Sequence, residues 1–558
     1  MSVTACRGTQ LRCRSWRAEA LLRLLENVLE VGERPEELVV YASIGKAVKD
    51  WDAYRQITDA LRRLGEDQTL VLQTGRPVAV LNTHAAAPMV VSAVNNTVGN
   101  WATEERFYSR LAEHKTIWGG LTAAAWQYIG RQGVLGGTYE LLRAALGRHF
   151  QETTAPHRWV LTAGLGGMGS SQPISARMLG LSTLVVEADP AKLARLHAAG
   201  GLDLVLDDLS EALAAVTTAT AKRRAVAVGL LGNAAEIFPA IAVGDALPDI
   251  VTDQTAAHDA RYGYLPAGYT LETWTSARER DPGRVERDAR TSMAAQIRAM
   301  LELGDRGSVV FENGNNLRVQ ASQVLGEGER ERVFAEIPGF MEAYLRPLFS
   351  RGIGPFRWMV LSGDEHDLKV VDDLASTMFP ERPEIARWIG LARRHIPLQG
   401  LPARSCWLGY GERSALAVAV NEAVADGRIT APVAFSRDHL DSAGMTHPRI
   451  GTEGMRDDSD GVTDWPLLDA MLLAAGGADL VAVHSGGGGY SGWMQSAGVT
   501  VVADGTQAAA IRLRRALDLD SGLGVIRHAT AGYGEALDAV EKSRQPGAHG
   551  EPLNLIQN

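Results

Sequence analysis

Four glycines interrupt the apolar run WVLTAGLGGMG at residues 159–169, and three of them have the spacing Gly164-x-Gly166-x-x-Gly169. This spacing is typical of a turn that binds the pyrophosphate of a dinucleotide. The first glycine permits a tight turn, the second lets the backbone approach the phosphates, and the third allows close packing of the following helix. The amino end of that helix offers N–H groups and the positive end of its dipole to the phosphates.

A carboxylate follows where dinucleotide-binding proteins hold the ribose. Glu187 closes the next apolar segment, STLVVEAD, near the separation of about 20 residues expected after the glycines. A carboxylate at this place repels a 2′-phosphate, so the residues favour NAD over NADP. Similar glycine turns occur in unrelated α/β proteins, but the strand before, the helix after and the acid together favour the dinucleotide site. They do not decide whether the dinucleotide transfers hydride.

The segments around this turn predict its scaffold. Apolar segments alternate with helical stretches and end in polar or glycine residues; they lie at 158–164, 182–188, 202–208, 225–232, 248–254 and 308–314. Such alternation predicts a parallel sheet covered on both faces, within an α/β fold. Leucines at helical spacing predict an amphipathic helix at 17–31. Short strands are expected at 38–43, 69–75 and 77–84.

Length and composition limit the classes of protein and partner that remain possible. The 558 residues are enough for two to four domains, and the net charge of −10 argues against nucleic acid or an anionic membrane as the main partner. Three cysteines (Cys6, Cys13, Cys406) form no disulfide framework and have no zinc spacing, so no metal is expected. No secretory signal and no apolar run of about 18 residues are present. We therefore expect a cytoplasmic protein without membrane spans.

Several longer sequence motifs resemble those of the urocanase (urocanate hydratase) family. They include VLTAGLGGMG, VTDQTAAHD, GYLPAG, RPLFSRGIGPFRW and RDHLDS, and the resemblance runs in order from about residue 11 to 540. The family adds water to the imidazole acrylate of urocanate, with tightly bound NAD+ as an electrophile that receives the imidazole and not as a hydride carrier. The resemblance implies a homodimer with a small-molecule substrate. It also implies a Rossmann-like NAD-binding domain at 145–345, inserted between core halves at 1–144 and 346–558.

The resemblance also carries over cofactor residues. The family's NAD+ contacts fall on Gln132, Gly167, Met168, Gly169, Glu187, Lys192, Asn233, Ala234, Gln254, Thr255, Ala256, Ala257, His258, Tyr264, Leu265 and Gly488. Lys192 stands where the family usually has an arginine, which keeps the charge but loses the planar fork.

Six side chains are the candidates for the chemistry. Cys406 falls on the cysteine that the family places beside the nicotinamide; the alternative is a small buried apolar residue. Arg357 suits the substrate carboxylate, since a guanidinium binds a carboxylate through two hydrogen bonds; a structural salt bridge is the alternative. Four residues are candidates for proton transfer and water activation: Tyr41, His84, Asp438 and Asp441. His439 is expected to orient a neighbour or to lie in the core.

The chain departs from the family pattern in sequence segments that are expected to face the substrate. Ala85, Ala86 and Met89 replace two acids and an arginine, and Ile450 stands where an arginine is expected. A smaller, more apolar lining changes substrate choice. It favours the branch of the family that hydrates 2-thiourocanate or its S-methyl derivative, formed in ergothioneine breakdown. The alternatives are an ordinary urocanate hydratase of histidine degradation, an NAD-dependent dehydrogenase, and an inactive NAD-binding protein.

Overall fold

The computed structural model describes residues 3–41, 44–448, 451–485 and 492–556. Within these residues the chain forms two compact units. Unit 1 contains residues 3–133, 346–448 and 454–556, and unit 2 contains residues 134–345 with 451–453. The first boundary, at 133/134, lies inside helix α4 (Arg131–Phe150), whereas 144/145 was expected from the sequence. No helix in the described part of the chain is long and apolar enough to cross a membrane.

Unit 2 is built on a parallel sheet with the order β11-β10-β6-β7-β9-β8. Its strands are β6 (Trp159–Ala163), β7 (Ser182–Glu187), β8 (Leu204–Leu206), β9 (Ala227–Leu231), β10 (Ile250–Val251) and β11 (Val309–Val310). All six predicted strands are therefore confirmed, as is the α/β class. The order differs from the common dinucleotide fold because β9 lies between β7 and β8.

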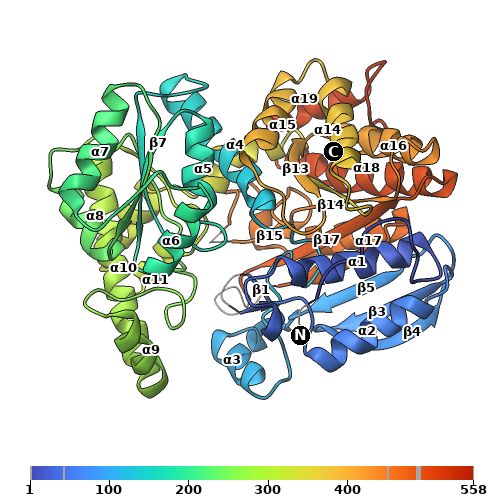
Figure 1. Cartoon of the computed structure of the whole chain (residues 1–558), viewed down its shortest axis with the longest axis horizontal. Coiled ribbons are helices and arrows are strands. Elements are labelled where there is room, and N and C mark those ends of the chain that lie inside the picture. Colours follow the sequence, from blue (N-terminus) through green and yellow to red (C-terminus); the bar gives the residue numbers. More distant parts are fainter. Residues whose placement is uncertain (1–2, 42–43, 449–450, 486–491, 557–558) are drawn as a thin grey trace. The chain divides into compact units, whose positions relative to one another are not determined.

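Helices lie on both faces of this sheet, with α5 and α7 on either side of β7 (Figure 1). The helices of the unit are α5 (Ser171–Met178), α6 (Pro190–Ala198), α7 (Leu209–Ala221), α8 (Ala234–Ala242), α9 (Leu271–Arg280), α10 (Pro282–Asp305), α11 (Leu317–Ser322) and α12 (Glu327–Glu336). The strand order reverses direction at β6, which pairs with β7 on one side and with β10 on the other. Ligands of open α/β sheets bind outside the carboxyl ends of strands at such a point.

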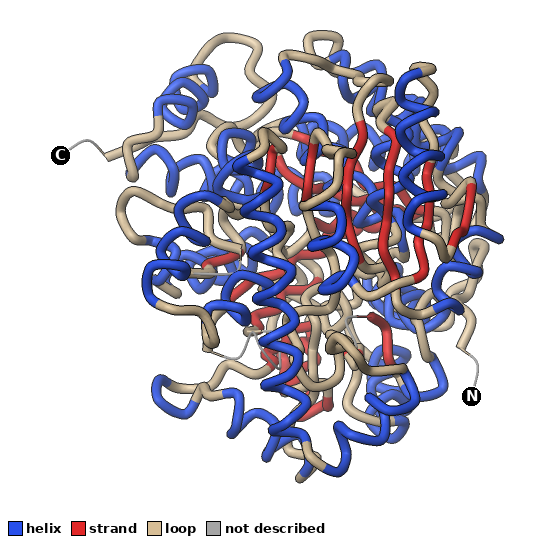
Figure 2. The backbone as a smooth tube through the Cα atoms, turned by 90° about the vertical axis from the view of Figure 1, so that its left-hand side faces the viewer, coloured by secondary structure: helices blue, strands red, loops and turns tan. Residues whose placement is uncertain are grey.

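Unit 1 contains a mixed nine-stranded sheet with the order β13-β12-β14-β17-β16-β5-β3-β4, and β15 pairs with β17. Figure 2 shows the strands of the chain in red and its helices in blue. The strands are β3 (Gln68–Gln73), β4 (Arg76–Asn82), β5 (Val90–Val94), β12 (Gly354–Val360), β13 (Ala403–Leu408), β14 (Val433–Arg437), β15 (Met445–Thr446), β16 (Leu480–His484) and β17 (Gln495–Ala503). A separate antiparallel pair joins β1 (Val39–Tyr41) to β2 (Gly45–Lys46).

The helices of unit 1 are α1 (Trp16–Glu30), α2 (Trp51–Arg63), α3 (Glu104–Ala112), α13 (Arg346–Phe349), α14 (Glu365–Met378), α15 (Pro383–His395), α16 (Glu412–Ala425), α17 (Asp464–Gly476), α18 (Gln507–Thr530) and α19 (Gly534–Ser543). Helix α1 matches the predicted segment, but the expected solvent-facing side is buried as well. Glu19 and Arg23 are fully buried and paired at 2.8 Å, and Arg12 covers them through a second ion pair with Glu19. Paired charges remove the penalty that would keep this side in water.

The buried His447 of unit 1 makes stability depend on pH. Burial lowers its pKa to about 3, against about 6.5 in the unfolded chain. A lowered pKa means full stability above pH 6.5 and a loss as the pH falls toward 3. Between pH 7 and 5 the wild type should lose about 2 kcal/mol more unfolding free energy than His447→Gln. Urea unfolding at both pH values measures this difference, and equal losses in the two proteins would contradict it.

Candidate active site

The glycine turn of unit 2 closes on itself after β6. Gly164 has φ +86°, and a Cβ on this residue would lie 2.3 Å from the carbonyl oxygen of Gln254, which follows β10. A Cβ on Gly169 would lie 2.0 Å from the carbonyl oxygen of Gly164. A Cβ on Gly166, by contrast, would meet no described atom within 4 Å. Two glycines therefore close the turn, and the third leaves open space of the kind that an approaching phosphate needs.

Glu187 at the end of β7 is tied to this turn. Its Oε2 accepts a hydrogen bond from the N–H of Leu165 at 2.6 Å, and its Oε1 accepts one from Asp189 at 2.9 Å. The ammonium group of Lys192 lies 3.9 Å from Oε2. The predicted ribose ligand therefore lies beside the predicted phosphate turn, while each oxygen keeps a lone pair for a further donor.

The remaining predicted cofactor residues of unit 2 gather at the same end of the sheet. They follow β9 or β10 or begin α8: Asn233, Ala234, Gln254, Thr255, Ala256, Ala257, His258, Tyr264 and Leu265. Asn233 caps α8 through Ala235 N–H at 2.9 Å and donates to the carbonyl of Leu265 at 3.1 Å. Gly167 and Met168 form the solvent side of the turn. Gly488 and Ile450 lie outside the described residues.

Sequence reasoning missed Asp253, which organises this end of unit 2. Its carboxylate accepts hydrogen bonds from Thr255 Oγ1 at 2.6 Å and Gln296 Nε2 at 2.8 Å, and also from Asn315 Nδ2. Tyr264 donates to the amide oxygen of Gln296 at 2.8 Å. Burial raises the pKa of Asp253 to about 6. The only signal in the sequence was one acid at the end of an apolar strand.

In unit 1, Arg357 of β12 is buried beside Asp438. Its Nη1 donates to the carbonyl of Gln127 at 2.9 Å, and its Nη2 pairs with the Asp438 carboxylate. Its Nε is buried without a hydrogen-bond partner among the described residues, as are both amide atoms of Gln132. Three unsatisfied polar atoms in one unit are costly unless a ligand or water completes them.

Tyr41 lies in the same group. Its phenol oxygen accepts hydrogen bonds from the N–H groups of Leu121 and Thr122, both at 3.1 Å, and from the Thr122 hydroxyl at 3.2 Å. Its ring stacks on Tyr128 at 4.7 Å. Burial raises the pKa of Tyr41, and the negative charge of Asp438 raises it further. The phenol therefore stays protonated at neutral pH, while three donors point at its oxygen.

The structure does not bring His84 to this group. His84 and residues 85–89 precede β5, and Arg17 holds the carbonyls of Ala85 and Ala87 at 2.7 and 2.9 Å. The turn bonded to Tyr41 lies instead near His484, at the carboxyl end of the parallel strands β5 and β16. The two ends are separated by roughly 13 Å along the strands. The alanine and methionine departures therefore do not line the group around Arg357.

Cys406 and Asp441 also lie apart from Arg357. Cys406 pairs with Phe356 on β12, next to Arg357, so its side chain faces the opposite side of the sheet. Asp441 forms a buried ion pair with Arg413 at 2.6 Å. Neither side chain therefore lies beside Arg357, and Asp441 is held in a structural ion pair. The sequence could not indicate this, because tertiary packing decides which side of the sheet a side chain faces and which partner it binds.

The described residues contain no group of three or more His, Cys, Asp or Glu that could hold a metal ion.

Three family models match the chain in order. They describe the urocanase N-terminal domain (residues 3–127), the urocanase Rossmann-like domain (130–344) and the urocanase C-terminal domain (347–542). The chain belongs to the urocanase family. The resemblance to this family that its sequence motifs indicated is thereby confirmed.

A curated relative of this urocanase-family chain is the S-methyl thiourocanate hydratase of Variovorax sp. (strain JCM 16519 / RA8). The two are 47% identical over 532 residues, which is 95% of each chain. A solved structure, L-tryptophan dehydrogenase from Nostoc punctiforme, covers 46% of this chain and 60% of its own at 13% identity. Its TM-score of 0.19 is too low to carry any argument.

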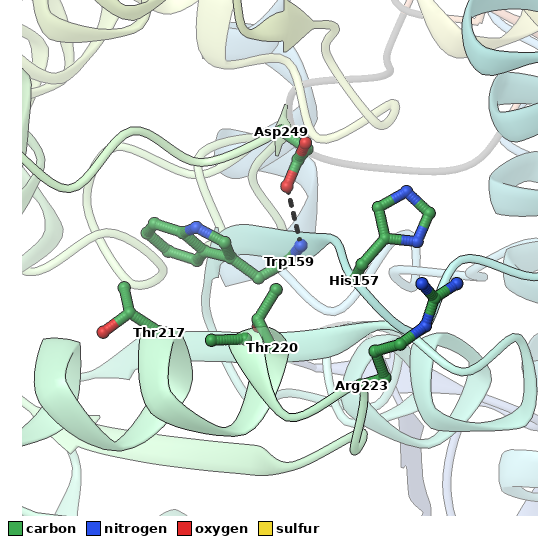
Figure 3. Close-up of a pocket in the computed structure, with 7 residues that line it drawn as sticks. His157, Trp159, Thr217, Thr220, Arg223 and Asp249 are labelled. Carbon is green, nitrogen blue, oxygen red and sulfur yellow. Dashed lines mark hydrogen bonds between the residues drawn. The ribbon is translucent and has the colours of Figure 1, made fainter.

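A cavity of about 440 Å³ in the Rossmann-like unit lies away from the glycine turn. Its walls include Trp159, Arg223 and Asp249, and the N–H of Trp159 donates to Asp249 at 2.9 Å (Figure 3). Trp159 begins β6, whereas the turn follows its last residue. The cavity is therefore at the amino ends of the strands, where open α/β sheets do not bind dinucleotides.

Proposed function

We propose that this chain adds water to an imidazole acrylate whose ring carries an S-methylthio group, and that it uses tightly bound NAD+. The observation that carries the proposal is the near full-length match, at 47% identity, to an S-methyl thiourocanate hydratase. The urocanase family models across the whole chain support the reaction class. The product is then the corresponding imidazolone propionate.

The residues of unit 2 fit the dinucleotide. The open space at Gly166 suits a phosphate, and the Glu187 carboxylate beside the turn suits the ribose hydroxyls. Lys192 places a cation near the same carboxylate. When bound, NAD+ supplies a positively charged, electron-poor ring that activates the imidazole of the substrate.

Arg357 is the proposed substrate-binding residue of unit 1, and Gln132 is the proposed NAD+ contact of the same unit. Arg357 keeps an unsatisfied Nε–H for the acrylate carboxylate, and its charge is offset by Asp438 in the resting protein. A charge-assisted hydrogen bond at a buried site fixes the orientation of the acrylate. Gln132 offers a donor and an acceptor that have no protein partner in the described chain.

Tyr41 is the proposed proton donor to the acrylate side chain. Its raised pKa keeps the proton at rest. The two N–H groups and the hydroxyl that point at its oxygen stabilise the phenolate that forms when the proton leaves. Asp438, next to Arg357, is the proposed acceptor for the proton of the attacking water. Return of that proton from Asp438 to the Tyr41 phenolate restores both groups, so that each cycle adds one water molecule to the acrylate.

Substrate choice tests this function directly. Purified protein should remove the conjugated acrylate absorbance of S-methylthiourocanate with a kcat/KM about 10²-fold above that for urocanate, as expected when one pocket fits one apolar substituent. We also measure 2-thiourocanate in parallel, and no NADH absorbance should appear with any of the three. A higher kcat/KM for urocanate would instead make this an ordinary histidine-pathway hydratase.

We also propose that the chain forms a homodimer, as the family resemblance implies. Light scattering of the purified protein should then give a mass about twice the 59.9 kDa of one chain. A mass of one chain at micromolar concentration would contradict the dimer and leave the hydratase proposal untouched.

A further inference from the structure

Two fully buried histidines of unit 1 contact one another. His439 follows β14 and His484 ends β16, and their Nε2 atoms are 2.6 Å apart. The ring centroids are 4.4 Å apart and the planes are inclined by 74°. This distance requires that one ring donates an N–H to the lone pair of the other. We call these two residues the imidazole pair.

The sheet makes room for the imidazole pair at one position. Strand β17 lies between β14 and β16, so His439 must cross β17 to reach His484. The residue at the crossing is Gly498, which pairs with Ala482. A Cβ there would lie 2.5 Å from His439 Nε2. The contact therefore depends on the absence of a side chain at this position of β17.

Both rings of the pair are expected to be neutral at pH 7. Burial is the largest cause that lowers both pKa values, to about 4 for His484 and well below the usual value for His439. The positive charges of Arg437 and Arg357 lower the pKa of His439 further. The backbone of Gly120 lies close enough to His484 to raise its pKa somewhat, without completing a hydrogen bond of good geometry.

The imidazole pair joins the two segments that carry the proposed proton donor and acceptor. Asp438, which pairs with Arg357, is the residue before His439. Gly120, beside His484, precedes the two N–H groups that hold the Tyr41 oxygen. The His439–His484 contact therefore links the segment that carries Asp438 to the segment that holds the Tyr41 oxygen.

We propose that His439 and His484 are positioning residues for the hydration: their direct contact sets the separation between the Asp438 carboxylate and the Tyr41 phenol. The proposal rests on the proposed function for its kinetic consequence, but the contact and its effect on Tyr41 are properties of the resting protein. Both can be measured without turnover.

Asparagine and glutamine variants separate the contact from simple burial. An asparagine amide reaches about as far as imidazole Nδ1, and a glutamine amide about as far as Nε2. His484→Asn and His439→Asn should therefore lose the contact and lower kcat by about 10²-fold, more than they raise KM, since small misplacements of catalytic groups have this cost. His484→Gln and His439→Gln should recover a large part of kcat.

His528→Asn is the matched control. His528 is equally buried in unit 1 and its Nδ1 lies 2.8 Å from the carbonyl of Gly524 within α18. Its replacement should lower stability and leave kcat of the folded fraction unchanged. If His439→Asn and His484→Asn change kcat no more than this control, and their glutamine variants recover nothing, the positioning role is overturned.

A measurement without substrate distinguishes failure of the pair from failure of the hydratase proposal. In protein labelled with ¹⁵N histidine, a scalar coupling should connect the two Nε2 nuclei across the hydrogen bond, and His484→Asn should abolish it. In ¹³C-tyrosine protein, the ring signals of Tyr41 should shift in His484→Asn but not in His528→Asn. Absence of the coupling or of that shift overturns the inference, even if hydration of the acrylates is observed; a protein that hydrates none of them but shows both signals refutes only the proposed function.

Discussion

A Gly169→Ala variant should be purified without bound dinucleotide and should be destabilised by about 1–3 kcal/mol. The added methyl group would lie 2.0 Å from the carbonyl oxygen of Gly164 and 2.7 Å from its carbonyl carbon. Both are backbone atoms and no flexible side chain can move aside, so the turn itself must open. Dinucleotide content after acid extraction and urea unfolding measure the two effects.

Two other glycines supply controls for this variant. Gly166→Ala meets no described atom within 4 Å, so it should fold with unchanged stability, but its methyl group occupies the space left for the phosphate and should weaken NAD+ binding. Gly328→Ala in α12 also meets open space; it should leave the NAD+ content unchanged and raise stability by up to about 1 kcal/mol, because alanine favours a helix over glycine. If Gly166→Ala retains NAD+ as tightly as wild type does, the phosphate does not approach the turn there.

The strands of unit 2 were predictable because buried parallel strands are continuously apolar, and the helices between them fix the chain direction. Their order was not. Nothing in the segment at 227–231 indicates that β9 lies between β7 and β8, since a strand buried on both faces carries no information about its neighbours. The polar side of α1 was misjudged for a related reason. Glu19 and Arg23 look solvent-exposed until the pairing with Arg12 is known.

Site residues were predictable where a short sequence motif determines the local geometry of the site. The turn at Gly164 and the carboxylate of Glu187 lie together because adjacent parallel strands end at the same edge. His84 was grouped with Tyr41 although it lies at the other end of β5, since sequence does not tell which strand end faces a site. The substrate branch was inferred partly from Ala85 and Met89, which lie at that far end. The relative supports the branch, but these residues do not explain it.

The imidazole pair shows what long-range packing adds. His439 and His484 are 45 residues apart in the sequence, and only His439 was expected to orient a neighbour or to lie in the core. Their contact depends on Gly498, a third position on a different strand. One glycine in an apolar strand is a weak signal by itself. It becomes informative only when the ring that crosses it is known.

Replacing Arg357 by glutamine should lower kcat/KM for the preferred acrylate by about 10² to 10³-fold, or about 3–4 kcal/mol, as expected when a buried charged hydrogen-bond partner is removed. The loss has two sources. The acrylate carboxylate loses the Nε–H that no described residue occupies, and Asp438 loses the cation that holds it. Arg357→Lys should recover only a part, because an ammonium group keeps the charge without the planar geometry.

A carboxamide analogue of the substrate separates these two sources. Wild-type protein should prefer the carboxylate strongly, and Arg357→Gln should lose most of this preference because the amide does not need a cation. Arg404→Gln is the matched control: Arg404 is equally buried on the neighbouring strand β13, faces the other side of the sheet and pairs with Asp372 at 3.0 Å. It should reduce stability and keep the preference. If Arg357→Gln still prefers the carboxylate as strongly as wild type does, Arg357 acts only through its pair with Asp438, and another group binds the acrylate carboxylate.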